Sequence, residues 1–132
     1  MEENKTNPLL QIRDLHVHYM SEGREIYAVN GVSLDINPGE TIGLVGETGA
    51  GKTTMALSIM KLIQQPAGRY AGGEILFGGE DLLRASENAM HHIRGNQIAM
   101  IFQDPMTSLN PVYTVGDQIA EVIALHQHMK SK

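Results

Sequence analysis

A glycine-rich segment from Gly46 to Thr53 has the residue types needed to hold a chain of phosphates. Its pattern, Gly-x-x-x-x-Gly-Lys-Thr, is a full match to the Walker A motif. Glycines at 46, 49 and 51 allow consecutive backbone N–H groups to turn into one concavity, where phosphate oxygens accept their hydrogen bonds. A helix that starts at the loop adds the positive end of its dipole. The segment therefore predicts a nucleotide polyphosphate site.

The side chains after the loop complete this chemistry. Lys52 is expected to reach the β- and γ-phosphates as a point charge, Thr53 to give its hydroxyl to Mg²⁺, and Thr54 to donate to the α-phosphate. A glycine-rich turn without function is the alternative, and the flanking strand and helix argue against it. The predicted nucleotide-binding residues of this loop are Gly46, Thr48, Gly49, Ala50, Gly51, Lys52, Thr53 and Thr54.

The elements that must position the loop can be read on both sides of it. Residues 41–45, Thr-Ile-Gly-Leu-Val, form a short apolar run typical of a strand buried on both faces. Residues 53–63 are rich in helix formers, and Pro66 with Gly68 stops them. A strand, a glycine loop and a helix are thus predicted in succession.

The N-terminal part predicts an antiparallel pair of strands. Within 9–19, Leu15, Val17 and Tyr19 alternate with two histidines, and the segment 25–36 alternates again after a polar turn. Further along we expect a strand at 72–77 turned by Gly78-Gly79, a short helix from Ser86 to near Gly95, a buried strand at 97–102, a loop at 103–111, and a helix begun by a capping box at Thr114 and Asp117.

Composition limits the classes of function. The chain has 132 residues, 42% of them hydrophobic, no cysteine and a formal charge of −5. A single α/β domain is expected, without disulfides or thiolate chemistry, and binding to nucleic acid is disfavoured. The polar N-terminus and the lack of a long apolar run predict a chain that is itself soluble and cytoplasmic.

The acid that follows the strand at 97–102 allows two interpretations. Asp104 resembles a Walker B carboxylate, the usual Mg²⁺ partner, but Gln103 holds the place directly at the strand end and Pro105 starts a loop. Gln103 is therefore the better candidate to reach the metal or the attacking water.

The histidines suggest a second, weaker possibility. A transition-metal site is conceivable, but no carboxylate is spaced to complete a ligand shell, so this alternative is disfavoured. The histidines concerned are His16 and His18, His91 and His92, and His126 and His128.

Three blocks of sequence together resemble a known family. They are 28–36, Ala-Val-Asn-Gly-Val-Ser-Leu-Asp-Ile, the Walker A loop, and 98–111, Ile-Ala-Met-Ile-Phe-Gln-Asp-Pro-Met-Thr-Ser-Leu-Asn-Pro. The chain, from Leu9 to about Gln127, resembles an ATP-binding subunit of an ABC transporter of the oligopeptide, dipeptide and nickel importer family. The segments 94–96 and 112–116 resemble the first of the two ATP-binding subunits that such importers carry.

The resemblance implies a fold and a ligand. The fold class is α/β, a P-loop NTPase of the ABC type, with an antiparallel N-terminal β-subdomain, part of the parallel-sheet core and the start of the helical subdomain. The cofactors are ATP and Mg²⁺. Tyr19 would stack on adenine, although the residues alone equally allow it to be a core side chain. Gln103 would be the catalytic residue that senses the γ-phosphate and binds Mg²⁺ with Thr53.

The resemblance also implies partners and a location. They are a second ATP-binding subunit, transmembrane permease subunits and, indirectly, a substrate-binding protein, with the chain on the cytoplasmic face of the inner membrane through the permease. Adjacent to the permease we expect Met106, Leu109 and Tyr113, which otherwise would be core residues.

The sequence also departs from the family pattern. A Leu-Ser-Gly-Gly-Gln signature, a Walker B strand with its catalytic Glu, and a switch His are absent from the 132 residues. Residues 1–132 are therefore interpreted as a partial nucleotide-binding domain that binds ATP without efficient hydrolysis. Its strands at 41–45 and 97–102 would lack their neighbours. The alternative is a stand-alone, non-hydrolytic regulatory module. A GTPase is less favoured because no Asn-Lys-x-Asp motif is present, and a P-loop kinase because the stretch after Gln103 offers no arginine-rich lid.

Overall fold

The computed structural model describes residues 7–104 and 108–127. They divide into two compact units, one up to Met90 and one from His91 onward. None of the helices in these ranges has the length and apolar character that a membrane span requires. In chain order the elements are β1 (Leu10–Ser21), β2 (Arg24–Ile36), α1 (Lys52–Ile59), β3 (Gly68–Phe77), β4 (Glu80–Asp81), α2 (Glu87–Ile93) and α3 (Val115–Gln127).

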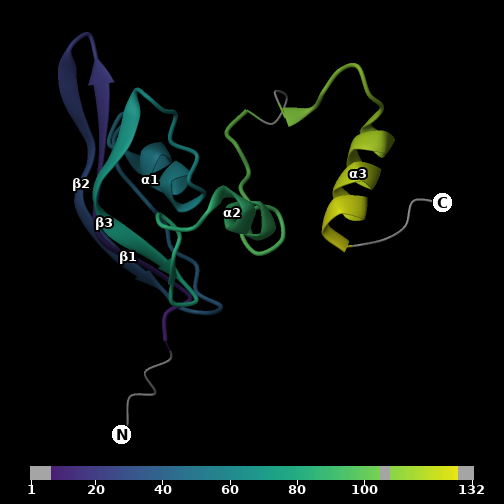
Figure 1. Ribbon diagram of the computed structural model, residues 1–132, viewed down its shortest axis with the longest axis horizontal. Coiled ribbons are helices and arrows are strands. Elements are labelled where there is room, and N and C mark those ends of the chain that lie inside the picture. The colour runs from purple at the N-terminus through teal and green to yellow at the C-terminus, as the bar shows by residue number, and fades with distance from the viewer. Residues whose placement is uncertain (1–6, 105–107, 128–132) are drawn as a thin grey trace, which may run out of the picture. The chain divides into compact units, whose positions relative to one another are not determined.

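The first unit contains an antiparallel sheet of order β2-β1-β3-β4. Figure 1 shows its strands β1, β2 and β3 side by side. The register of β1 with β2 runs from Leu10↔Ile36 to the hairpin end at Ser21↔Arg24, and β1 also pairs with β3. The predicted antiparallel pair and its polar turn are therefore confirmed. The strand predicted at 72–77 is also present, although it starts earlier, at Gly68.

β1 contains a bulge that keeps its apolar side chains on one face. Leu10 and Ile12 are buried before the bulge, and Leu15 and Val17 after it, so the parity of the buried positions changes. The register shifts between Ile12 and Leu15, where Asp14 has a φ of 45°. Without the extra residue, one of the two pairs would point to the opposite face of the sheet.

The core lies against the face of the sheet that Leu15 and Val17 share; we call it the core face. Other buried side chains of this unit come from β2, from α1 and the segment after it, from β3, and from the segments that follow β4. The largest fully buried side chains are Ile12, Leu15, Val17, Ile75, Leu82 and Met90. Packing of this cluster is the main source of stability, because the chain has no disulfide.

Helix α1 is shorter than the 53–63 predicted. It ends at Ile59, and Lys61 adopts a left-handed backbone with a φ of 52°. The amide of Leu62 closes this end by donating to Leu57 O at 2.9 Å. The Lys61 Nζ donates to Ala85 O at 2.6 Å, which ties the end of the helix to a later segment. Local helix propensity could not predict this contact, because the two residues are 24 positions apart in the sequence.

Two predictions of buried strands were wrong. Residues 41–45 are not a strand, and Val45 is 93% exposed. In place of a strand at 97–102 there is a single parallel bridge between Arg94 and Ile98, and Ile101 is 94% exposed. A strand exists through hydrogen bonds to a neighbour, and no described segment pairs with 41–45 or extends the bridge at Ile98.

The second unit contains α3, which starts as predicted. Thr114 Oγ1 accepts a hydrogen bond from the Asp117 amide at 3.1 Å and donates to Asp117 Oδ2 at 2.7 Å. The Gln118 side chain fixes the preceding loop by donating to Asn110 O at 3.0 Å. Large apolar side chains of this unit remain exposed: Leu109, Val112, Tyr113, Val115, Ile119, Val122, Ile123 and Leu125.

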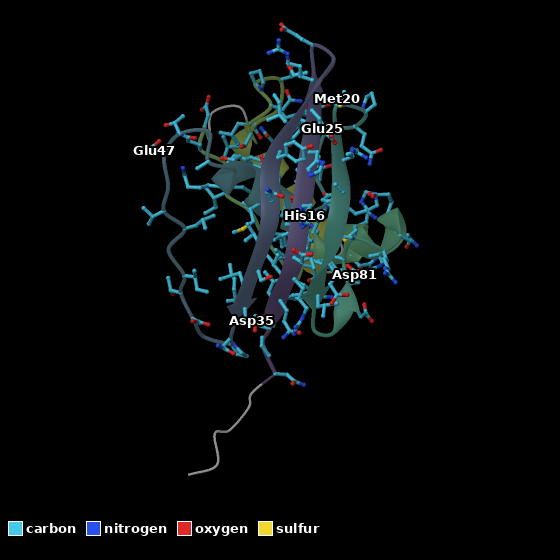
Figure 2. All side chains as sticks on the ribbon, turned by 90° about the vertical axis from the view of Figure 1, so that its left-hand side faces the viewer. His16, Met20, Glu25, Asp35, Glu47 and Asp81 are labelled. Carbon is cyan, nitrogen blue, oxygen red and sulfur yellow. The ribbon has the colours of Figure 1, made fainter. Side chains whose placement is uncertain are left out.

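The opposite, outer face of the sheet carries a polar network. His16 contacts Asn30 Oδ1 and Asp14 Oδ1, each at 3.1 Å. His18 contacts Glu25 Oε1 at 2.9 Å through Nδ1, and Arg69 forms an ion pair with the same carboxylate. Figure 2 shows His16 and Glu25 along the paired strands, with Asp35 toward the other end of β2. The predicted alternation of histidines with apolar residues is thus confirmed.

The buried face of β1 should be sensitive to truncation. Leu15→Ala removes a fully buried side chain, and we expect the free energy of unfolding to fall by roughly 2–5 kcal/mol. Met20→Ala is the matched control on the same strand, because Met20 is 48% exposed, and it should cost less than about 1 kcal/mol. Urea denaturation measures both. Equal losses would contradict the assignment of the core face.

Acid should weaken the polar network. Hydrogen bonds from Arg69 and then His18 lower the pKa of the Glu25 carboxyl in the folded state. A lowered carboxyl pKa stabilises the fold above the unfolded pKa, and this contribution disappears as the pH falls through the folded pKa. The stability difference between the parent and Glu25→Gln should therefore be largest at neutral pH and shrink toward about pH 3. Denaturation at both pH values measures it, and a constant difference would contradict the network.

Candidate nucleotide-binding site

The glycine loop leads directly into α1, as the motif requires. Gly51 is the N-cap of α1 and has a φ of 79°. A Cβ at this position would overlap the carbonyl oxygen of Ala28 on β2. The register between β1 and β2 passes over Ala28, which is a bulge residue on its strand. Only glycine satisfies both the backbone angle and this close approach, so the loop is seated on β2 through Gly51.

The loop folds around the ammonium group of Lys52. Nζ donates to the carbonyl oxygens of Gly46 at 2.6 Å and of Glu47 at 2.5 Å. The Ala50 amide donates back to Glu47 O at 3.1 Å, which closes the turn. Figure 2 shows Glu47 on this loop, away from the strands. A positive charge is thus held inside the loop by two nearby backbone carbonyls.

The start of α1 is suited to an anion. Its first turn carries no acidic residue, and no side chain in the described part of the chain caps Gly51. The first N–H groups of the helix are therefore available to a ligand, and the helix dipole favours negative charge there. Thr48 and Thr53 are exposed, and Thr54 is half-buried. Together with Lys52, these groups fit the phosphates of a nucleotide and a bound Mg²⁺.

A cavity of about 220 Å³ lies beside the loop. The strand β2 forms one wall and the loop with the start of α1 forms the other. Its lining is mostly apolar apart from Lys52, Asn30 and Tyr27. The lining residues are Tyr27, Ala28, Val29, Asn30, Val32, Leu44, Val45, Ala50, Gly51, Lys52 and Met55. The structure thus brings together three of the predicted residues, at positions 50 to 52, with a part of β2 that sequence reasoning did not assign to the site.

Tyr19 lies near the end of β1 and is half-buried. It pairs with Ile26 on one side and Gly68 on the other. A Cβ on Gly68 would come within 2.7 Å of the Tyr19 ring atom Cε1 and would overlap Ile63. The ring therefore contacts β3 at a place where a side chain would exclude it. Tyr19 does not line the cavity beside the loop.

Gln103 lies in the second unit and is exposed. Its neighbour Asp104 is exposed as well. The assignment of Gln103 as a metal and γ-phosphate ligand stays a prediction. Met106, expected near the permease, lies outside the described residues, whereas Leu109 and Tyr113 are both exposed, and not core residues.

The histidines suggested as metal ligands fall into two groups. His16 and His18 contact polar side chains on the sheet, and His91, His92 and His126 belong to the second unit. Among the described residues, no group of three or more His, Asp or Glu side chains is arranged to hold a metal ion. A cavity of about 450 Å³ in the second unit is lined by His91, His92, Arg94, Asn96, Leu125 and His126, with no carboxylate in that lining. His128 lies outside the described residues.

Sequence reasoning missed two participants in this region. Glu47, which had no assigned role, supplies a carbonyl to Lys52. Gly68, interpreted only as a helix stop, is the strand residue beneath the Tyr19 ring. A glycine opposite an aromatic residue on a paired strand is a known sheet feature, but finding it requires the register of β1 with β3.

Known proteins resemble the chain over most of its length. It is 50% identical over 127 residues to the peptidoglycan transport ATP-binding protein YejF of Agrobacterium fabrum. This match covers 96% of this chain and 23% of that protein. It is 47% identical to the oligopeptide transport ATP-binding protein OppD of Bacillus subtilis, over 94% of this chain and 35% of that protein. The chain thus spans about a quarter to a third of the length of these relatives.

Solved structures confirm the fold class predicted from the sequence. The dimeric structure of MJ0796, a bacterial ABC transporter cassette, superposes with a TM-score of 0.79 at 22% identity, over 93% of this chain and 50% of that one. Its post-hydrolysis state bound to ADP and Pi gives a TM-score of 0.78. At this identity the likeness concerns the fold alone.

A sequence model of one family also matches the chain. Its description is ABC transporter, and the match covers residues 29–132. The matched range includes the glycine loop, Lys52 and Gln103, together with most of β2. The chain belongs to the ABC transporter family.

Proposed function

We propose that the chain is the nucleotide-binding part of an ATP-binding subunit of a peptide-type ABC importer. The observation that carries the proposal is the loop itself, in which Gly51 is seated on β2 and Lys52 places its ammonium group among the loop carbonyls. The relatives named for peptide transport support the class of cargo. In this proposal residues 1–132 are a partial nucleotide-binding domain.

The nucleotide is ATP with Mg²⁺. Backbone N–H groups from Gly46 to Gly51 hold the phosphates, and Lys52 exchanges its two carbonyl partners for phosphate oxygens, which bind an ammonium more strongly because they are charged. Thr53 gives its hydroxyl to Mg²⁺, and Thr54 donates to a phosphate. Bound Mg-ATP supplies the free energy that drives transport, whereas these residues bind and orient it.

Two residues outside the loop complete the proposed site. Tyr19 stacks on adenine through the part of its ring that is not buried against Gly68. Gln103 contacts Mg²⁺ and the γ-phosphate.

The proposed partners are a second ATP-binding subunit, the transmembrane permease subunits and, through them, a substrate-binding protein. The chain would lie on the cytoplasmic face of the inner membrane, held there by the permease. The exposed apolar side chains around Leu109, Tyr113 and Val115 are a suitable contact surface, since such clusters mark sites of protein association.

The phosphate role of Lys52 is tested by calorimetry. Mg-ATP should bind the purified protein, and Lys52→Ala should weaken binding about tenfold or more because one charge-assisted contact is lost. Arg24→Ala is the control, since it removes one positive charge at the exposed hairpin end. Equal affinity of the parent and Lys52→Ala would contradict the assigned role.

Binding without turnover is tested separately. The 132 residues contain no signature motif, no Walker B strand with a catalytic Glu, and no switch His. Phosphate release by this chain should therefore equal that of the Lys52→Ala control, because the residues that activate water in the family are not among the 132. Turnover that depends on Lys52 would contradict the proposal and show that an unrecognised group supplies the base. The second candidate function is a regulatory module that binds nucleotide without hydrolysing it. Such a protein would also release no phosphate above the control, but it would not interact with a permease.

A further inference from the structure

One carboxylate on the outer face joins the strands of the sheet. Glu25 lies on β2 and contacts His18 on β1 at 2.9 Å through Oε1. The same oxygen forms the ion pair with Arg69 on β3, and the other oxygen accepts the Tyr27 hydroxyl at 3.5 Å. The side chain of His18 is only 12% exposed, and its ring packs edge-on against Tyr27 at 4.4 Å between centroids. The contacts of Glu25 therefore cross β1, β2 and β3.

This junction lies at the rungs of the sheet that carry Tyr19. In the register, His18 is opposite both Tyr27 and Arg69, and the next residue, Tyr19, is opposite Gly68. Met20 is opposite Glu25, and Figure 2 shows these two near the same end of the sheet. Because successive side chains of a strand point to opposite faces, a fixed His18 on the outer face also fixes the backbone that aims Tyr19 from the core face.

The core face gives the Tyr19 ring a defined seat. A Cβ on Gly68 would lie 2.7 Å from Cε1 of the ring, and Gln64 O and Ile63 line the same place. Two features thus fix the position of the Tyr19 ring. The first is the space left by the absent side chain of Gly68, and the second is the position of β1 relative to β3. The second depends on Glu25 and Arg69.

We propose that Glu25 is a positioning residue for nucleotide binding: by holding His18 and Arg69 together, it keeps the end of β1 in the geometry in which Tyr19 receives the adenine ring. The inference rests on the proposed function, in which Tyr19 stacks on adenine. It assigns Glu25 to the base of the nucleotide and not to its phosphates, because Glu25 contacts the strand that carries Tyr19, whereas the close approach that seats Gly51 involves Ala28 and Val29 and none of the partners of Glu25.

The test compares Mg-ATP with magnesium tripolyphosphate, which has the phosphates but no base. Tyr19→Ala should weaken ATP binding about fivefold or more, as loss of a base-stacking ring does, and leave tripolyphosphate binding unchanged. Glu25→Gln should weaken ATP binding about threefold or more, again without effect on tripolyphosphate. In the Tyr19→Ala background, Glu25→Gln should add no further loss.

Two further variants make the comparison specific. Glu22→Gln removes the same charge from the exposed turn of the same hairpin and should bind both ligands like the parent. Arg69→Gln breaks the ion pair from β3 and should reproduce the selective loss of ATP affinity. Unchanged tripolyphosphate binding also shows that the loop is folded in every variant.

The outcomes separate the two proposals. A parent protein that binds neither ligand overturns the proposed function. A parent that binds ATP, with Glu25→Gln equal to it, or with losses that add to those of Tyr19→Ala, overturns only the positioning role. Equal loss of both ligands in Glu25→Gln overturns it too, since that result reports general destabilisation. Full ATP affinity of Tyr19→Ala also overturns the positioning role, because Tyr19 would then not be the residue that receives adenine.

Discussion

β1 forms antiparallel backbone pairs along both of its edges, with β2 on one side and β3 on the other. A strand paired on both sides has its backbone N–H and C=O groups satisfied, whereas each of its neighbours would expose a full edge without it. The core residues Leu15 and Val17 lie on one face of this strand and His16 and His18 on the other. Both the hydrophobic core and the polar network therefore exist only in the register that β1 imposes.

The glycine loop lies against this sheet at Gly51, where a side chain would overlap a backbone carbonyl of β2. Gly51 approaches the carbonyl of Ala28 at the point where the register of β2 passes over a residue. A bulge turns a backbone group out of the regular ladder, and here that group meets the loop. The segment 41–45 on the other side of the loop has no strand partner in the described part of the chain. The position of the loop is thus set by β2 and α1, and its internal shape by Lys52.

Sequence reasoning succeeded where the information is local. The loop, the hairpin at Ser21–Arg24 and the capping of α3 by Thr114 each depend on residues a few positions apart, and all three are formed. It failed at 41–45 because apolar residues alone do not make a strand. It also missed the bulge at Asp14, although a signal was available: the buried positions are even at Leu10 and Ile12 and odd from Leu15 onward.

The two parts of the proposed ligand differ in how the chain encodes them. Lys52 and its carbonyl partners are separated by at most six positions, so the contacts that shape the inside of the phosphate loop are local in the sequence. Glu25 and Arg69 are separated by 44 positions, and their contact exists only after β3 has paired with β1. The seat of the Tyr19 ring is therefore complete only in a sheet in which β3 is paired with β1. A motif search finds the phosphate site because it is local, whereas the geometry of the base site depends on cross-strand neighbours that no contiguous pattern contains.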